Sequence, residues 1–122
     1  MISTTIPIQG TFDIAKGRSS LRTHIAVQRW PPTFGARAAA VLTALGELII
    51  NAGHHNMVIV RMIVIEDGND AGVQFSCSIH LPEGEQRAFN ESSDRLGRAA
   101  DDVQIQDIAG NQQILASAFL NT

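Results

Sequence analysis

The sequence predicts an α+β domain, a two-layer sandwich in which one mixed, mostly antiparallel five-stranded sheet carries its helices on one face. Residues 34–52 place apolar side chains at helical spacing and therefore predict a long amphipathic helix. Residues 2–8 and 73–81 alternate apolar and polar side chains, which indicates strands. Two helical segments followed by hairpins are typical of α+β folds.

Composition narrows the class of protein. A chain of 122 residues with 44% apolar and 17% charged side chains predicts one globular domain, residues 1–122. The net charge of −3 gives no basic face, so we expect no nucleic-acid partner. The single cysteine, Cys77, excludes an internal disulfide and fits a reducing compartment. The chain start lacks a signal-peptide pattern and the longest apolar run, residues 57–65, is too short to span a bilayer. We therefore expect a cytoplasmic protein that does not contact membranes.

The first strand and helix follow from local signals. Residues 2–8 form the expected strand, and Pro7 places it at an edge of the sheet, because proline cannot donate to a ladder. Thr11 or Asp13 is expected to cap a helix that runs to about Arg29. The basic residues of this helix are expected on its solvent side.

The central helix, residues 34–52, is expected to begin after the Trp-Pro-Pro sequence, with Thr33 as its cap. Gly53 suits the left-handed position that follows a helix. Glu47 and Asn51 lie one turn apart and off the apolar stripe, so a carboxylate sits beside an amide. From the residues alone, this pair is either a nucleotide-and-metal site or only a polar helix face.

The second half of the chain predicts the remaining strands. Residues 57–66 are β-branched and apolar on both faces, which indicates a central strand or one with an exposed apolar face. Residues 73–81 place Cys77 among the inward side chains and Ser76 and Ser78 among the outward ones. We expect Cys77 to be a buried apolar residue rather than a nucleophile.

Beyond these strands the pattern weakens. Residues 82–93 are polar and lack any period, so we expect a long loop there. Residues 94–101 predict a short helix. A last hairpin, turned at residues 109–111, is expected to complete the sheet.

The order of the predicted helices and strands, together with several short sequence stretches, resembles the histidine-kinase-like (GHKL) ATPase domain, in the small form found in bacterial anti-sigma-factor serine kinases. The resemblance rests on five stretches: Ile6-Pro7-Ile8, Asp13-Ile14, Phe34-Gly35-Ala36-Arg37, Glu47-Leu48-Ile49-Ile50-Asn51-Ala52-Gly53 and Ala100-Asp101-Asp102-Val103-Gln104-Ile105. It covers nearly the whole chain and implies a Bergerat-like ATPase fold. The Glu-x-x-x-Asn spacing on the central helix is its most specific part.

The resemblance also implies roles for two side chains. Glu47 would act as the general base toward water or a hydroxyl, and Asn51 would be the metal ligand that holds the magnesium bridging the ATP phosphates. Carboxylate and amide oxygens one turn apart can converge on one ion, and magnesium prefers oxygen ligands.

Two family motifs are missing. The Asp-x-Gly-x-Gly that grips adenine is replaced by Ser76-Cys77-Ser78-Ile79-His80-Leu81-Pro82-Glu83-Gly84, and the glycine-rich lid by Asp94-Arg95-Leu96-Gly97-Arg98-Ala99. Backbone cradles for phosphate depend on such glycines. Arg95 and Arg98 are the candidates to bind phosphate in their place. We therefore expect weak or absent ATP binding and no cofactor; an active form would use ATP and magnesium.

Two functional hypotheses follow. The first is a regulatory module that resembles an anti-sigma-factor kinase, binds a protein partner in a sigma-factor regulatory network and forms a homodimer. The alternative is an active ATP- and magnesium-dependent protein serine kinase that acts on an anti-sigma antagonist. The second apolar face of residues 57–66 favours a protein partner or a dimer, because an exposed apolar patch marks an interaction site.

Overall fold

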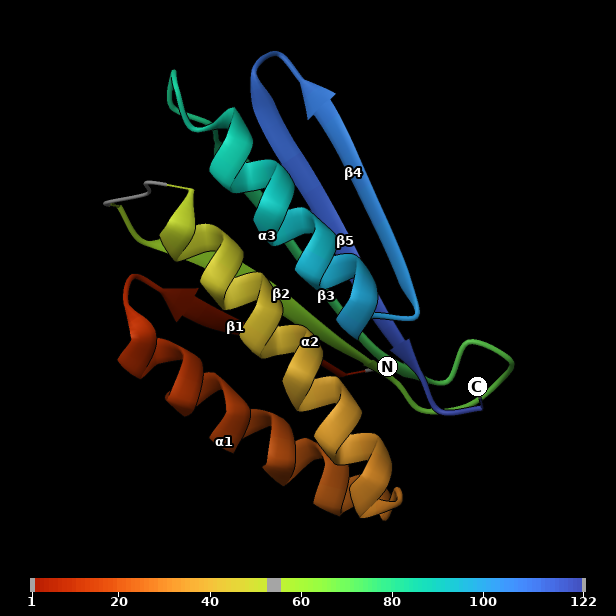
Figure 1. The fold of residues 1–122 in the computed structure, drawn as a ribbon. Helices are drawn as coiled ribbons and strands as arrows, with labels where there is room; N and C mark the ends of the chain where they lie inside the picture. Colours follow the sequence, from red (N-terminus) through yellow and green to blue (C-terminus); the bar gives the residue numbers. More distant parts are fainter. Residues whose placement is uncertain (1, 53–55, 122) are drawn as a thin grey trace.

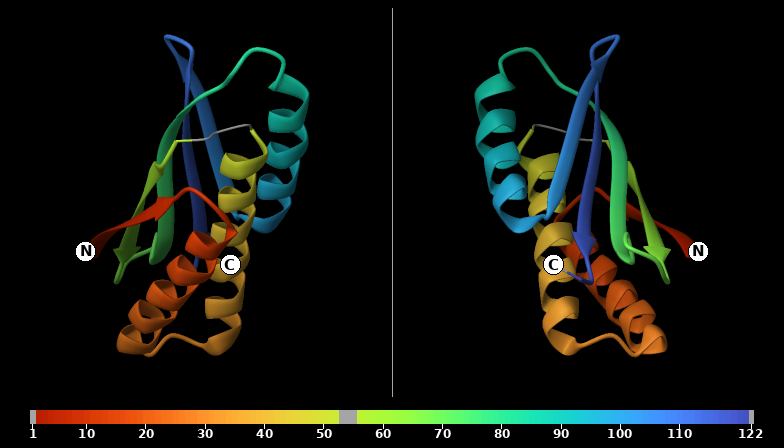
Figure 2. Two further views of the ribbon diagram at one scale, coloured as in Figure 1. Left: turned by 90° about the vertical axis from the view of Figure 1, so that its left-hand side faces the viewer. Right: turned by 90° about the vertical axis from the view of Figure 1, so that its right-hand side faces the viewer.

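The computed structural model describes residues 2–52 and 56–121 and has the predicted α+β architecture (Figures 1 and 2). The elements, in chain order, are β1 (Ile2–Ile8), α1 (Thr11–Gln28), α2 (Pro32–Asn51), β2 (Val58–Ile65), β3 (Gly72–His80), α3 (Gln86–Ala99), β4 (Asp102–Ile108) and β5 (Asn111–Phe119). The five strands form one sheet in the order β1-β2-β3-β5-β4. All four pairings between neighbouring strands are antiparallel. The predicted two-layer sandwich with helices on one face is confirmed.

Helix α2 is the centre of the core. It lies between α1 and α3 in the helix layer (Figure 1). Its buried stripe is the predicted one and consists of Phe34, Ala38, Val41, Leu42, Leu45, Leu48 and Ile49. By length and composition α2 is also apolar enough to cross a membrane, but a core helix passes the same test. Because its apolar stripe packs against the sheet and the other helices, we describe α2 as the core helix of this domain.

Close packing of α1 on α2 depends on a glycine. A Cβ atom added at Gly46 would lie 2.6 Å from Cγ1 of Ile14, which is closer than side chains normally approach. The missing side chain therefore lets the two helices approach each other where Ile14 enters the core.

The starts of two helices differ from the predictions. Gly10 is the N-cap of α1, and Asp13 lies in the first turn, where its Oδ2 accepts hydrogen bonds from the backbone N–H groups of Gln9 and Gly10. Helix α2 begins at Pro32, so Thr33 lies within its first turn rather than at the cap. Proline suits a first helical position because its missing N–H would be unpaired there in any case. The predicted end at Gly53 lies outside the described residues.

The predicted loop at residues 82–93 is wrong from Gln86 onward. Helix α3 begins at Gln86 and continues to Ala99, which covers residues 94–99 of the short helix expected at residues 94–101. Phe89, Ser92 and Leu96 are its buried residues. These three residues recur at helical spacing, but only two of them are apolar, and packing against α2 supports the helix.

Candidate functional site

Glu47 and Asn51 both lie on the solvent side of α2. Each is exposed, while Leu48 and Ile49 between them are buried. Neither side chain makes a hydrogen bond or an ion pair with another described residue, and neither belongs to the lining of the three grooves described for this chain. The carboxylate and the amide therefore stand one turn apart on the solvent side of the helix.

Arg95 and Arg98 are exposed on α3. Nη2 of Arg95 donates to Oγ of Ser92 at 3.0 Å on the same helix. Helix α3 itself packs against α2 and buries Phe89 and Leu96. Helices α2 and α3 are thus neighbours in the helix layer. They contact each other through apolar side chains, whereas Arg95 and Arg98 point to solvent.

No described residues form a metal centre. Among residues 2–52 and 56–121, no group of three or more His, Cys, Asp and Glu side chains is placed to hold an ion. Asn51, the predicted magnesium ligand, has Glu47 as its only acidic neighbour one turn away on the helix. A magnesium site would therefore need several further oxygen ligands from water or from a nucleotide.

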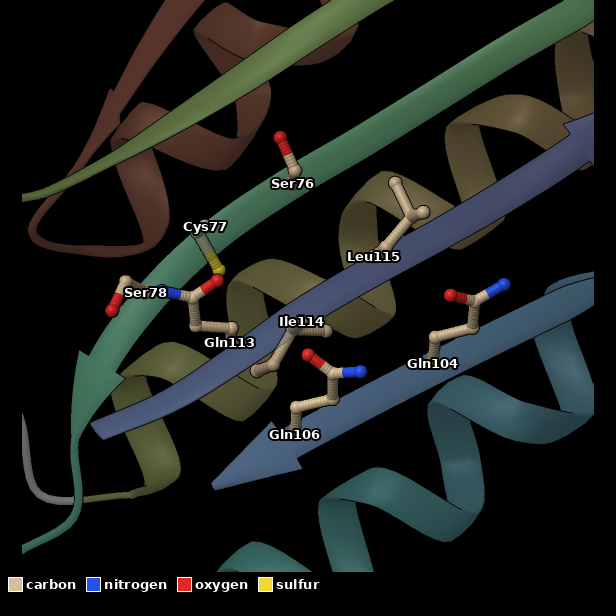
Figure 3. A pocket seen from close by; sticks show the side chains of 8 residues that line it. All are labelled: Ser76, Cys77, Ser78, Gln104, Gln106, Gln113, Ile114 and Leu115. Carbon is tan, nitrogen blue, oxygen red and sulfur yellow. The ribbon is translucent and has the colours of Figure 1, made fainter. Parts of the chain in front are cut away.

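The sheet face opposite the helices, called here the outer face, carries a polar groove of about 370 Å³. Figure 3 shows its outward side chains in front of the sheet, with the helices behind. Three strands contribute to the lining, which consists of Ser76, Cys77, Ser78, Gln104, Gln106, Gln113, Ile114 and Leu115. Because none of these side chains is charged, the groove offers neutral hydrogen-bond donors and acceptors rather than a place for phosphates.

An apolar strip lies on the same face along β2. It consists of Met57, just before the strand, and Ile59, Ile63 and Ile65, and the exposed Arg61 interrupts it between Ile59 and Ile63, opposite Ser76 of the groove. Met57 is 55% exposed and Ile59 51% exposed, whereas Ile63 and Ile65 are half-buried. The inward residues of β2, by contrast, are buried in the core. Of the two arrangements that the sequence allowed for this strand, the structure has the one with an exposed apolar face.

Cys77 is partly buried at the edge of the outer groove, and its surroundings disfavour a reactive thiolate. It occupies an inward position on β3 between Phe75 and Ile79, as the alternation predicts. Desolvation by burial raises the pKa of its thiol to about 12. Since the thiolate is the nucleophile, a thiol with this pKa remains protonated and inert at neutral pH.

A second, apolar groove of about 470 Å³ lies between α1 and α2, near their connection. Trp30 lies in this lining and meets the ring of Phe34 edge to face, with centroids 5.4 Å apart. Ile25, Ala26, Pro32 and small residues of α2 form the rest, with Arg22 at the border. Its chemistry suits an apolar side chain and offers little for hydrogen bonding.

The outer groove is the feature that sequence reasoning missed. Gln104 and Gln106 alternate with Val103 and Ile105, so their outward direction could be deduced from the sequence. Their position beside Gln113 depends on the pairing of β4 with β5. Comparison of the chain with protein-family models and with curated proteins found no match.

Proposed function

We propose that the chain is a cytoplasmic regulatory module that resembles an anti-sigma-factor kinase, binds a protein partner and does not depend on ATP. The observation that carries the proposal is the uncovered outer face, where an apolar strip, interrupted by the single charge of Arg61, adjoins a groove with no charged lining residue. Such a combination fits the surface of another protein better than a charged small molecule. The sigma-factor network as the source of the partner comes from the resemblance alone.

The packing of α3 supports the loss of ATP binding. In the family the lid leads into a helix that cradles phosphates, and this chain has Phe89 and Leu96 of α3 buried against the core instead. The element order on which the resemblance rests is also the order of the elements in the structure. A nucleotide bound where α3 packs would have to displace these apolar side chains, which is costly.

The kinase alternative is supported by one observation. Glu47 and Asn51 are both exposed and engage no other described side chain, so they are free to meet a magnesium ion and its water shell. Any activity of this pair would require the nucleotide to bind on the solvent side of α2. The two functions therefore make opposite predictions for ATP.

Thermal unfolding with and without Mg-ATP separates them. A site with a dissociation constant of ~10 μM, tested at ~1 mM nucleotide, would stabilise the fold by about 2.7 kcal/mol. That corresponds to a rise in melting temperature of roughly 10 °C for a domain of this size. We expect no rise. A rise that disappears in Asn51→Ala would show an ATP site at Asn51, as the kinase alternative requires, and would remove our proposal.

Binding of purified sigma factors and anti-sigma antagonists from the same organism tests the partner surface. Ile59→Ser removes an exposed apolar side chain from the outer face, and Phe12→Ser does the same on α1, where Phe12 is 73% exposed. We expect Ile59→Ser to weaken partner binding at least tenfold and Phe12→Ser to leave it unchanged. Equal effects of the two variants, or no binding by the unmodified chain, would refute the proposed surface.

A further inference from the structure

The free edge of the sheet at β4 is open to another strand. β4 is the last strand in the order β1-β2-β3-β5-β4, and it pairs with β5 on one side only. Its seven residues, Asp102–Ile108, include no proline, lysine or arginine, which are the residues that most often protect an edge. The opposite edge strand, β1, contains Pro7. Of the two edges, β4 is the one whose backbone can accept a further strand along its whole length.

The turn of the hairpin determines which backbone groups face this edge. Ala109 and Gly110 have φ of 54° and 84°, as in the two-residue type I′ turn, and Ile108 pairs with Asn111 beside it. In such a hairpin the pair next to the turn exchanges hydrogen bonds, and hydrogen-bonded pairs then alternate along the ladder. Val103, Ile105 and Asp107 consequently direct their N–H and C=O groups away from β5.

We propose that β4 pairs antiparallel with β4 of a second copy of this chain, in a two-fold register centred on Ile105. In this register Ile105 faces its own counterpart, Val103 faces Asp107 and Gln104 faces Gln106. Every outward backbone group named above then finds a partner in the other copy. The two sheets become one continuous sheet, and no carboxylate lies opposite another within the pairing.

Other registers are less favourable. A shift of one residue would turn the helices of the second copy to the opposite side of the sheet, because side chains alternate along a strand. A shift toward the start of β4 would pair Asp107 with Asp101, whose backbone N–H already donates to the C=O of Ser117 in β5, so this pair would lack a ladder hydrogen bond. A shift toward the hairpin would place Val103 opposite Ala109 in the turn, outside the strand. Among the registers in which β4 could pair with β4 of a second copy, the one centred on Ile105 is therefore the most favourable.

The helix layer leaves room for the second copy. Helix α3 approaches β4 at its Ala99 end, where the chain turns into the strand, and the hairpin end of β4 extends beyond the helices (Figure 1). Val103 and Ile105 are only half-buried on the helix side of the strand, and Asp107 is exposed. Because the pairing is antiparallel, α3 of each copy would lie near the uncovered hairpin end of the other. The two Ile105 side chains would cover each other at the centre.

The contact is small, so its strength is limited. Stable complexes bury roughly 800 Å² on each partner, more than one strand of seven residues provides. We therefore expect a reversible dimer that forms at micromolar or higher concentration. The proposal does not depend on the proposed function, since it concerns the sheet edge and not the outer face or the ATP site.

Charge variants at Gln104 and Gln106 test both the dimer and its register, because both side chains are exposed and face each other across the proposed two-fold axis. Gln104→Lys with Gln106→Glu creates opposite charges across the interface, and Gln104→Lys with Gln106→Lys creates like charges. The dissociation constants, measured by sedimentation equilibrium, should differ by roughly tenfold, with the Lys/Glu variant tighter. The Lys/Lys variant adds two positive charges to a net charge of −3, giving −1, which by itself would favour association.

A backbone variant tests the edge directly. Ile105→Pro removes an N–H that points away from β5, so the monomer should fold while the dimer is lost. Amide hydrogen exchange of the unmodified chain gives an independent measurement, in which Val103, Ile105 and Asp107 should become protected as concentration rises. A chain that stays monomeric at ~1 mM, or a dimer with equal dissociation constants in the two charge variants, would overturn the proposal.

Discussion

Nη1 of Arg37 and Oδ2 of Asp101 lie 3.1 Å apart and connect the first turns of α2 to the junction between α3 and β4. The same carboxylate oxygen accepts a hydrogen bond from the backbone N–H of Phe119 at 2.7 Å. Nη2 of Arg37 donates to the backbone C=O of Phe119 at 2.8 Å. These bonds join the helix layer to the end of β5 and to the chain segment that leads into β4.

Arg37→Ala is expected to destabilise the fold by about 1–2 kcal/mol. The substitution removes an ion pair and leaves the C=O of Phe119 without its charged donor, and hydrogen bonds to charged groups are worth more than neutral ones. The stacking of the guanidinium 5.3 Å above the ring of Phe34 is lost as well. Urea unfolding followed by circular dichroism measures the change.

Arg87→Ala is the matched control for that variant. Arg87 pairs with Glu91 at 3.4 Å on the exposed face of α3, so its removal should cost less than about 0.5 kcal/mol. Equal losses for the two arginines would show that the Arg37 bonds contribute no more than a solvent-exposed ion pair.

Gly46→Ala is expected to destabilise the chain by about 1 kcal/mol, although alanine favours helices. The added Cβ would lie 2.6 Å from a buried atom of Ile14, and the cost of overpacking exceeds the gain in helix propensity. At Gly35 the same change meets Ile25 at 3.5 Å, an ordinary contact, and should stabilise by up to about 1 kcal/mol. Opposite signs in urea unfolding would support the packing argument, and stabilisation by both variants would contradict it.

Asp13 gives a prediction for acid pH. The backbone N–H groups of Gln9 and Gly10 donate to its carboxylate and hold its pKa below the ordinary value of 3.8. A lowered pKa in the folded state means that the carboxylate stabilises the fold above that ordinary value. This contribution is lost as the pH falls through the lowered pKa.

Melting temperatures of the unmodified chain and of Asp13→Asn, measured from pH 6 to pH 2, test this linkage. The unmodified chain should be the more stable at pH 6, and the difference should shrink toward pH 2 as Asp13 becomes protonated. A difference that stays constant over this range would show that the carboxylate charge does not stabilise the start of α1.

Cys77 should resist alkylation in the native chain. At pH 8 a thiol with a pKa of about 12 is ionised in roughly one molecule in ten thousand, whereas an ordinary thiol is ionised in about a quarter. Labelling by iodoacetamide, followed by mass spectrometry, should therefore be at least a hundredfold slower in buffer than in 8 M urea. Comparable rates in the two solutions would place the thiol in solvent.

The sequence was most informative where one element carries its own pattern. The apolar stripe of α2 predicted its buried residues, and the alternation of β3 predicted the inward position of Cys77. The start of α3 was missed because Ser92 interrupts its buried stripe and because Asn90 and Ser93 have low helix propensity. The helical spacing of Phe89, Ser92 and Leu96 was a local signal for this helix, and its contact with α2 supports it.

The candidate site was harder to predict because it depends on pairing between distant segments. Ser76 and Gln113 come close only because β3 and β5 are neighbours, while β4 follows β5 at the edge. The alternation of apolar and polar residues indicates which side chains point outward, but it does not show which strands are neighbours in the sheet. The roles implied for Glu47, Asn51, Arg95 and Arg98 remain predictions, and the structure adds that all four side chains are exposed.

The turn at Ala109 has a consequence for the dynamics of the domain. An alanine with φ of 54° adopts a left-handed conformation that glycine and asparagine tolerate better, so the tip of the hairpin is slightly strained. Since β5 is the only strand that holds β4, fraying of the native state should start at this tip and proceed along the strand. The part of the sheet that is best suited to recruit a neighbour is thus also the part that opens most readily without one.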